Sequence, residues 1–271
     1  MSIARSLLPF VLYLYSFSLA AQADHWDAYI ARQAKGISST TLNLALKDEA
    51  PVRGLPFVVV TGVYFRDCMK DGLPTPTEFI RLGMINDSVQ SWIGQASRRN
   101  IPAGTFTYQC SSAGYTYVTD TLHIRPLLQY KFARVFPGYV TTIRIEADSS
   151  WNAYLHFLYP NEEVREYMAN QKSVIALQRA GDRPDKPRTT THWLYFSSKG
   201  GADCFLKFAK LKQFRFGAAE STGETERPWK VTIRRVDKVD LESISKLTTE
   251  LRSKAKSCGG SYGGWETTVV N

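Results

Sequence analysis

The stretch HWLYFSSKGGADCFLKFAKLKQ, residues 192–213, decides the fold of the C-terminal half of the chain. Its first residues are uniformly bulky, which is typical of a β-strand. Residues 201–213 then follow helical spacing, with Cys204, Phe208 and Leu211 on one side. A strand followed directly by an amphipathic helix indicates an α+β domain in which helices pack on one face of a sheet.

Outward from this stretch, the C-terminal half continues to alternate strands and helices. Residues 172–180 predict an extra helix before the first strand, and Asp240 caps a long helix that Gly259-Gly260 ends. That helix has an apolar stripe made of Leu241, Ile244, Thr248, Leu251, Ala255 and Cys258. Further strands are expected at residues 214–219, 229–234 and 265–270. The order β-α-β-β-α-β predicts a ferredoxin-like sandwich.

The N-terminal half predicts a second helix-on-antiparallel-sheet domain with the order β-β-α-β-β-α-β. Strands are expected at residues 40–46, 56–65, 105–110, 115–118 and 140–147, with a turn at Ala113-Gly114. A helix opens at Thr75-Pro76 with Glu78 placed to complete a capping box, and residues 122–136 form another. The apolar face of the first helix is Phe79, Leu82, Ile85, Val89, Trp92 and Ile93. The aromatic-rich stretch at 151–167 is interpreted as the junction between domains.

The first residues of the chain resemble an export signal. Arg5 provides a positive charge, residues 7–20 form a short apolar run, and Ala21 and Ala23 provide small residues for cleavage before Asp24. The alternative is an uncleaved anchor, but the run is short for a bilayer and Pro9 interrupts it. We therefore expect a leader at 1–23, an α+β domain at 24–160, a second domain at 161–271, a periplasmic location and no stable membrane insertion.

The chain is basic, with a formal net charge of +9. Arg5 is the only charged residue before Asp24, and from Asn161 onward 20 Lys and Arg face 14 Asp and Glu. A basic C-terminal half suits acidic proteins, anionic lipid or polyanionic polymers, whereas the plainer alternative is a well-solvated surface. Nucleic acid is not an expected partner, because the chain has no Lys/Arg tract and is expected to be exported.

The four cysteines are Cys68, Cys110, Cys204 and Cys258, and an even number in an oxidising compartment indicates pairing. In a ferredoxin-like sandwich the two helices are antiparallel, so the first turn of one meets the last turn of the other. This geometry favours a Cys204–Cys258 disulfide and, by exclusion, a Cys68–Cys110 disulfide. The alternative is four buried thiols.

The residue pattern predicts no catalytic set, no metal site and no cofactor. His25, His123, His156 and His192 are scattered, and His192 is expected at a strand end in a polar network. Asp67 and Asp71 flank a turn, where short carboxylates usually cap backbone groups. No serine lies in a G-x-S-x-G turn, and the glycines after Cys258 lack the Lys-Ser/Thr of a phosphate loop. We therefore do not expect an enzyme.

Two surfaces remain as candidates. A protein interface is expected at the end of the chain, where aromatic and basic residues gather beside flexible glycines: Tyr262, Trp265, Glu266, Arg252, Lys254 and Lys256. The alternative is that Trp265 fills the core. An inter-domain pocket is the second candidate, formed by the aromatic stretch that contains Trp151, Tyr154, His156 and Tyr159.

Nearly all of the chain after residue 23 resembles known bacterial families. The C-terminal half resembles the RraB family, through Gly181-Asp182, Pro187-Arg188, residues 192–196 and residues 259–267. The N-terminal half resembles the domain-of-unknown-function 695 family, which is often fused to RraB-like domains. The residues that carry this second resemblance are Trp26, Tyr29, Asp71–Thr75, Glu78-Phe79, Trp151 and residues 158–162.

The RraB resemblance implies a ferredoxin-like fold and a regulator that binds ribonuclease E in the cytoplasm. This chain departs from that pattern, because its signal indicates export, its RraB-like half is basic, and Gly263 replaces the usual acidic residue of the Tyr-x-Gly-Trp ending. We therefore expect a non-enzymatic protein-binding or regulatory module of the envelope. The alternatives are a small-ligand binder or enzyme using the inter-domain region, and a ribonuclease E regulator if the leader is not a signal.

Overall fold

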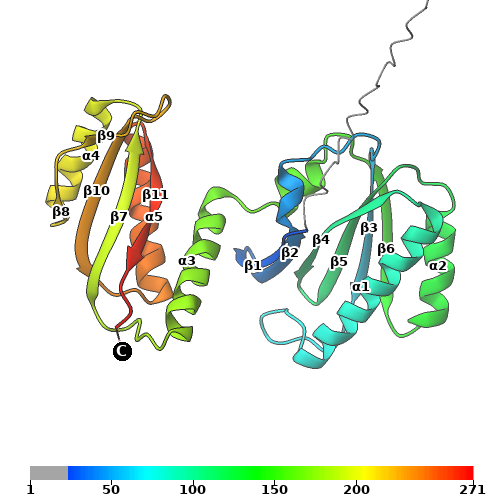
Figure 1. Cartoon of the computed structure of the whole chain (residues 1–271). Coiled ribbons are helices and arrows are strands. Elements are labelled where there is room, and N and C mark those ends of the chain that lie inside the picture. The colour runs from blue at the N-terminus through cyan, green and yellow to red at the C-terminus, as the bar shows by residue number, and fades with distance from the viewer. Residues whose placement is uncertain (1–23, 271) are drawn as a thin grey trace, which may run out of the picture.

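The computed structural model describes residues 24–270 as two α+β domains joined through one helix (Figure 1). The predicted leader and its cleavage site after Ala23 lie outside the described residues. Each domain packs helices on an antiparallel sheet, so the predicted fold class is confirmed. The expected domain boundary at 160/161 falls in the short segment before the connecting helix.

The N-terminal domain contains a six-stranded antiparallel sheet in the order β1-β2-β4-β5-β3-β6. The β3 strand is rich in β-branched residues, and Val58–Val63 are buried because the sheet is covered on both faces at this strand. The strands are β1 Trp26–Gln33, β2 Gly36–Asn43, β3 Phe57–Tyr64, β4 Asn100–Tyr108, β5 Ser111–Val118 and β6 Val140–Ala147.

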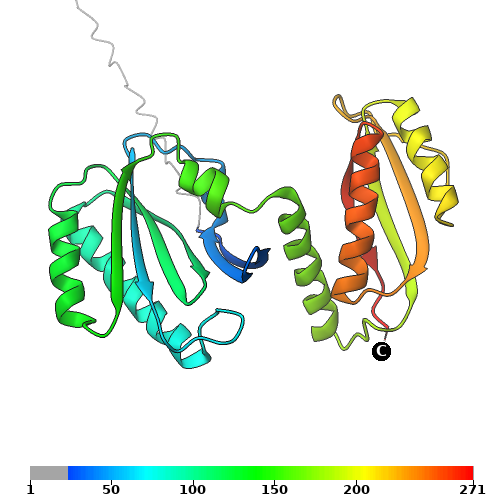
Figure 2. The same cartoon turned by 180° about the vertical axis from the view of Figure 1, so that it is seen from behind.

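Two helices, α1 Pro76–Ala96 and α2 Ile124–Val135, cover one face of this sheet (Figures 1 and 2). The predicted start of α1 is confirmed, because Thr75 Oγ1 accepts a hydrogen bond from Glu78 N at 3.3 Å and Pro76 occupies the first turn. The opposite face carries two short turns of helix, η1 Leu44–Lys47 and η2 Ala153–Leu158. The sheet therefore separates two apolar clusters.

The hairpins of this domain differ from the sequence prediction. The chain reverses at Gln109 and Cys110, both with positive φ, and Ala113-Gly114 lies inside β5. The pattern missed this turn because it lacks the Asn-Gly or Asp-Gly pair that usually marks such a reversal. The β1 strand was also missed, because this edge strand contains residues with low β-propensity and has no fully buried side chain.

The predicted junction at 151–167 is divided between the two domains. The η2 turn packs in the N-terminal core, and the next helix, α3 Glu162–Arg179, packs on the C-terminal domain (Figure 2). The α3 helix begins ten residues before the predicted start at 172. Asn161 caps it by accepting a hydrogen bond from Val164 N at 2.9 Å, and Glu162 and Glu163 complement the helix dipole.

The C-terminal sheet runs β11-β7-β10-β8, which is the strand order of a ferredoxin-like sandwich and confirms that prediction. The β11 strand begins at Gly260, five residues before the expected start at 265. At Gly260 an added Cβ would lie 2.3 Å from the ring of Phe196, so only glycine allows this approach. The elements are β7 Arg188–Phe196, α4 Lys199–Leu211, β8 Arg215–Phe216, β9 Glu220–Ser221, β10 Trp229–Asp237, α5 Leu241–Ser257 and β11 Gly260–Thr267.

Both predicted disulfides are formed. Cys204 in the second turn of α4 bonds Cys258 at the end of α5, and Cys68 bonds Cys110 in the β4–β5 turn. Each disulfide therefore staples one domain. Between residues 24 and 270, no helix has the length and apolar character needed to cross a bilayer.

Candidate functional site

A cleft of about 910 Å³ lies in the N-terminal domain between α1 and the sheet, and we call it the α1 cleft. Its wall is one side of α1, its floor is the face of β2, β4 and β5, and one end is the loop before α1. The cleft forms because the two helices pack mainly over β3, β5 and β6, so that this face of β2 and much of β4 stays open in the described part of the chain. No feature of the sequence had marked this site.

The floor of the α1 cleft consists mainly of hydroxyl side chains. Alternation along each strand brings them to the face that α1 also covers, and the strand register aligns them in rows, with Thr41 opposite Thr105 and Thr107 opposite both Ser39 and Ser112. Thr107 and Ser112 share a hydrogen bond at 3.0 Å. The floor can therefore hydrogen-bond a polar edge of a bound molecule.

The α1 wall presents apolar side chains to solvent. Phe79 is 68% exposed and Ile80 is 66% exposed, although Phe79 was predicted on the buried face of the helix. The rest of that predicted face is confirmed, because Leu82, Ile85, Val89, Trp92 and Ile93 are buried. Phe79 is not part of the buried face because it lies in the first turn of α1, beyond the part of the sheet that the helix covers.

One end of the α1 cleft is held rigidly. The disulfide between Cys68 and Cys110 ties the loop before α1 to the β4–β5 turn, and Cys110 N also donates to Gly72 O at 2.9 Å. Met69, Leu73 and Pro74 of this loop line the cleft. The shape of this end is therefore fixed before any ligand arrives, which lowers the entropy lost on binding.

A second hollow, of about 770 Å³, lies between the domains and is lined by β1, η2, α3 and α5. Phe157 contributes to it and packs against Phe106 with ring centroids 4.9 Å apart. His156 and Tyr159, two of the four residues expected in an inter-domain pocket, also line this groove. Its two walls belong to different domains, which an ion pair between Asp27 of β1 and Lys172 of α3 connects.

The other two expected pocket residues, Trp151 and Tyr154, are fully buried inside the N-terminal domain and do not line the groove. The Trp151 ring stacks on Tyr117 at 3.8 Å, and its Nε1 donates to Leu55 O at 3.0 Å. The Tyr154 hydroxyl donates to Asn43 O at 2.7 Å. Burial raises the pKa of Tyr154. These side chains join η2 to the sheet.

Two residues of the expected protein interface contact α3 of the same chain. Trp265 Nε1 donates to Asn170 Oδ1 at 2.8 Å, and Arg252 pairs with Glu166 at 2.9 Å. Burial raises the pKa of Glu166, although Thr248 and Arg252 act in the opposite direction. Of the remaining candidates, Tyr262 forms a hydrogen bond with His192, and Lys254 lies over the Phe208 ring. Lys256 and Glu266 are exposed. An external partner at this surface stays a prediction.

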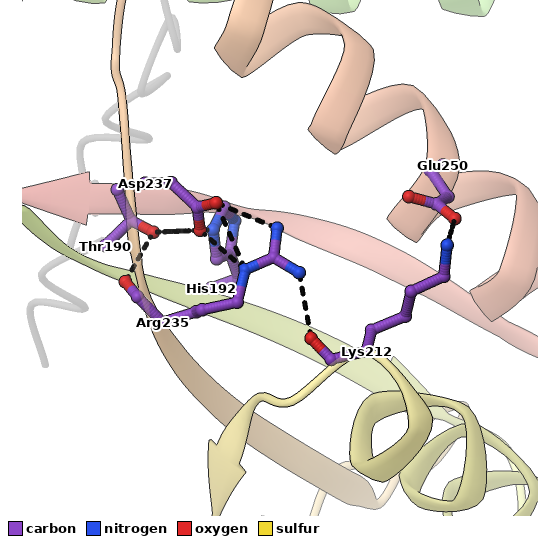
Figure 3. Close-up of polar contacts among 6 residues, drawn as sticks. All are labelled: Thr190, His192, Lys212, Arg235, Asp237 and Glu250. Atoms are coloured by element: carbon purple, nitrogen blue, oxygen red, sulfur yellow. Dashed lines mark hydrogen bonds and ion pairs between the residues drawn. The ribbon is translucent and has the colours of Figure 1, made fainter. Parts of the chain in front are cut away.

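His192 lies fully buried in a polar network of the C-terminal domain (Figure 3). Its Nδ1 is 2.8 Å from the Tyr262 hydroxyl, and its Nε2 is 3.2 Å from Thr190 Oγ1. Thr190 in turn bonds Asp237, which pairs with Arg235 (Figure 3). Both ring nitrogens have partners and the His192 side chain is shielded from solvent, so His192 connects β7 to β11 inside the sheet.

Burial lowers the pKa of His192 to about 4, with Asp237 opposing this and Arg235 adding to it. The unfolded chain binds this proton near pH 6.5, so unfolding takes up a proton between these two values. We therefore expect the free energy of unfolding to fall by about 3 kcal/mol, through this residue, as the pH drops from about 6.5 to about 4. Urea titrations of the wild type and of His192→Gln at several pH values measure the difference; parallel pH profiles would contradict the prediction.

The other candidate residues are separate. Among residues 24–270, no three His, Cys, Asp or Glu side chains gather into a group that could hold a metal ion. Asp71 Oδ1 accepts a hydrogen bond from Leu73 N at 3.0 Å, which is a turn-capping contact. Asp67 pairs with Arg81 at 3.0 Å.

Comparison with known proteins gives two family matches. Residues 24–159 match the family of unknown function DUF695, and residues 168–267 match the family described as regulator of ribonuclease activity B, RraB. The division between the two matches coincides with the segment that joins η2 to the first turns of α3. Among curated proteins there is no match.

Two solved structures are similar over most of the chain but at low superposition quality. One is an unknown protein from Galdieria sulphuraria, at 12% identity and a TM-score of 0.23, covering 79% of this chain and 99% of that one. The other is a putative glycine cleavage system transcriptional repressor, at 10% identity and the same TM-score, covering 79% and 98%. Neither supports an inference about function. The chain belongs, through its N-terminal domain, to the family of unknown function DUF695, and its C-terminal domain matches the RraB family.

Proposed function

We propose that this protein is a non-enzymatic binding module of the bacterial cell envelope that holds a partner protein in the α1 cleft. The observation that carries the proposal is the apolar rim of the cleft. Exposed apolar side chains gathered around a concavity usually mark a protein-binding surface. Here they come from three separate segments: Trp26 of β1, Met69 of the loop before α1, and Phe79 and Ile80 of α1.

The α1 cleft is favoured over the inter-domain groove because it belongs to a single domain. Its wall and floor are fixed by the core beneath α1, and the Cys68–Cys110 disulfide holds one end. The groove instead changes shape with any movement of one domain against the other. A preformed cleft loses less entropy on binding, so more of the contact energy contributes to affinity.

An envelope location agrees with the two disulfides, since such bonds persist in oxidising compartments. We propose that the chain is exported to the periplasm and that its leader is cleaved after Ala23. An exported protein does not meet a cytoplasmic ribonuclease, so the regulatory role named for the RraB family would pass here to another protein partner.

We expect a photo-activated cross-linking residue at position 80 to capture a partner protein in intact cells. Ile80 is on the rim of the cleft and is 66% exposed. Val140 of β6 has the same 66% exposure, is also aliphatic and lies outside the cleft, which makes it the matched control. The measurement is mass spectrometry of purified adducts, and the expected result is a reproducible partner from position 80 and none from position 140.

Equal labelling from both positions would contradict the proposal, because the cleft would then have no preference over any exposed apolar residue. Capture of ribonuclease E would overturn the envelope location and restore the cytoplasmic role. Capture of a periplasmic or membrane-attached protein would support both parts of the proposal.

A further inference from the structure

We infer that the occupant of the α1 cleft is an amphipathic helix of the partner, which lies on β2 and β4 beside α1 and completes the helical layer of the domain. This inference rests on the proposed function and names the shape and chemistry of what is bound. It is carried by the layer geometry of the domain, a glycine on the cleft side of α1, and the charge of the lining.

The first argument is the incomplete helical layer. Packed helices lie about 8–10 Å apart, and neighbouring strands about 4.8 Å apart, so one helix covers roughly two strands. Two helices therefore cover about four strands of a six-stranded sheet. The cluster beneath α1 and α2 takes its sheet residues from β3, β5 and β6, whereas the floor of the cleft is formed by β2, β4 and the start of β5. The open width matches one more helix.

The second argument is the side of α1 that faces the cleft. The buried side chains of Leu82, Ile85 and Val89 form the base of this side. Outside them, seven lining residues recur every three or four positions, which is the pattern of a helix–helix contact stripe: Pro76, Phe79, Ile80, Gly83, Asn86, Asp87 and Gln90. Gly83 lies at the centre of this stripe, and an added Cβ there would meet no atom within 4 Å. Glycine inside a helix costs about 0.5–1 kcal/mol relative to alanine. No contact among the described residues requires glycine here, whereas a second helix crossing at this point would.

The third argument concerns charge and shape. Among the described residues that line the cleft, Asp87 is the only charged one. The complementary surface is therefore apolar with one basic residue opposite Asp87, and polar groups along its edge can meet the hydroxyls of the floor. A second copy of this chain is disfavoured, because a two-fold dimer would set this concave surface against itself.

The test places the photo-activated cross-linking residue at position 80 in one variant and at position 87 in another. Ile80 and Asp87 are two helical turns, or about 10 Å, apart along α1. If the occupant is a helix lying along α1, the two positions label partner residues about seven apart. If it is an extended strand, the labelled residues are about three apart. Fragment sequencing of the purified adducts distinguishes the two results.

A substitution gives an independent check. We expect Gly83→Leu to lower the position-80 adduct roughly tenfold, because a bulky side chain at the crossing point forces the helices apart. Ser91→Leu is the matched control, since Ser91 is exposed on the same helix and outside the cleft. The melting temperature should not fall for Gly83→Leu, because leucine is a better helix former than glycine.

The failures of the two proposals are distinguishable. Absence of any preference for position 80 over 140 removes the binding site itself. If positions 80 and 87 label partner residues about three apart, the binding site stands but its occupant is not a helix. The same conclusion follows if Gly83→Leu leaves the position-80 adduct unchanged. Labelling of residues 1–23 or of a second copy of the chain overturns the assignment to a partner.

Discussion

Replacing Arg188 by Met is expected to destabilise the C-terminal domain by about 3–5 kcal/mol, because it leaves the Asp182 carboxylate buried without its counter-charge. The Asp182 side chain is 0% exposed and that of Arg188 only 4%. Burial acts to raise the pKa of Asp182, but hydrogen bonds from Val270 N and Arg188 outweigh it, so the pKa lies below its ordinary value. Without Arg188 the buried carboxylate keeps the donor Val270 N but loses its counter-charge.

The matched variant replaces both partners, Asp182→Asn together with Arg188→Met. The side-chain amide oxygen that Asp182→Asn introduces can still accept a hydrogen bond from Val270 N, and no charge remains buried. We expect the double variant to be more stable than Arg188→Met alone, which is the coupling that a double-mutant cycle measures. Urea unfolding of the wild type, Asp182→Asn, Arg188→Met and the double variant gives the four free energies of unfolding that the cycle needs. A cost below about 1 kcal/mol for Arg188→Met would contradict a stabilising buried ion pair.

This result would also explain why Gly181-Asp182 and Pro187-Arg188 mark the C-terminal domain in the sequence. Arg188 donates to the carbonyls of Arg183 and Lys186, and Asp182 accepts from Val270 near the end of the chain. The pair closes the loop between α3 and β7 and attaches the segment after β11 to it. These motif residues are therefore structural.

Removing the Cys204–Cys258 disulfide with a Cys204→Ala, Cys258→Ala variant is expected to cost about 4 kcal/mol, because the bond closes a loop between residues 54 positions apart. It joins the start of α4 to the end of α5, the two helices that cover the C-terminal sheet. Loss of the bond allows the unfolded C-terminal half many more conformations, and the folded domain loses stability relative to it.

The measurement should report each domain separately, since a two-domain chain need not unfold in one step. Amide hydrogen exchange does this. We expect faster exchange in β7 and β10 and unchanged exchange in β3 and β5, whose domain keeps the Cys68–Cys110 disulfide. Equal acceleration in both sheets would show that the two domains unfold as one unit.

Much of the fold was predictable because the strongest local patterns agree with the tertiary packing. The β3 strand contains the β-branched run Val58–Thr61, and α1 starts at the Thr75 cap, although Glu78 bonds Tyr139 and Arg81 and does not close the predicted capping box. The α5 helix has a stripe whose residues Ile244, Thr248, Leu251 and Ala255 are buried. The order of these elements predicted the ferredoxin-like sandwich, and that sandwich in turn predicted which cysteines pair.

The prediction was weaker where partners distant in the chain decide a residue's position. Trp151 and Tyr154 were expected in a pocket, but the aromatic stretch continues into the core of the N-terminal domain. Composition shows that aromatics gather there, and it does not show which ones face inward. The position of Trp265 under α3 depends on Asn170, which is 95 positions away in the chain.

The sequence by itself determined the two α+β domains, because hydrophobic periodicity and caps are local properties that each element shows on its own. The predicted order of those elements then determined the disulfide pairs, and the family resemblance rested on short motifs. Only the tertiary structure decided where a partner can bind. The α1 cleft arises because two helices cover part of a six-stranded sheet, and the exposure of Phe79 and Ile80 follows from that shortfall. The width of a layer is a property of the assembled domain, and no single segment encodes it.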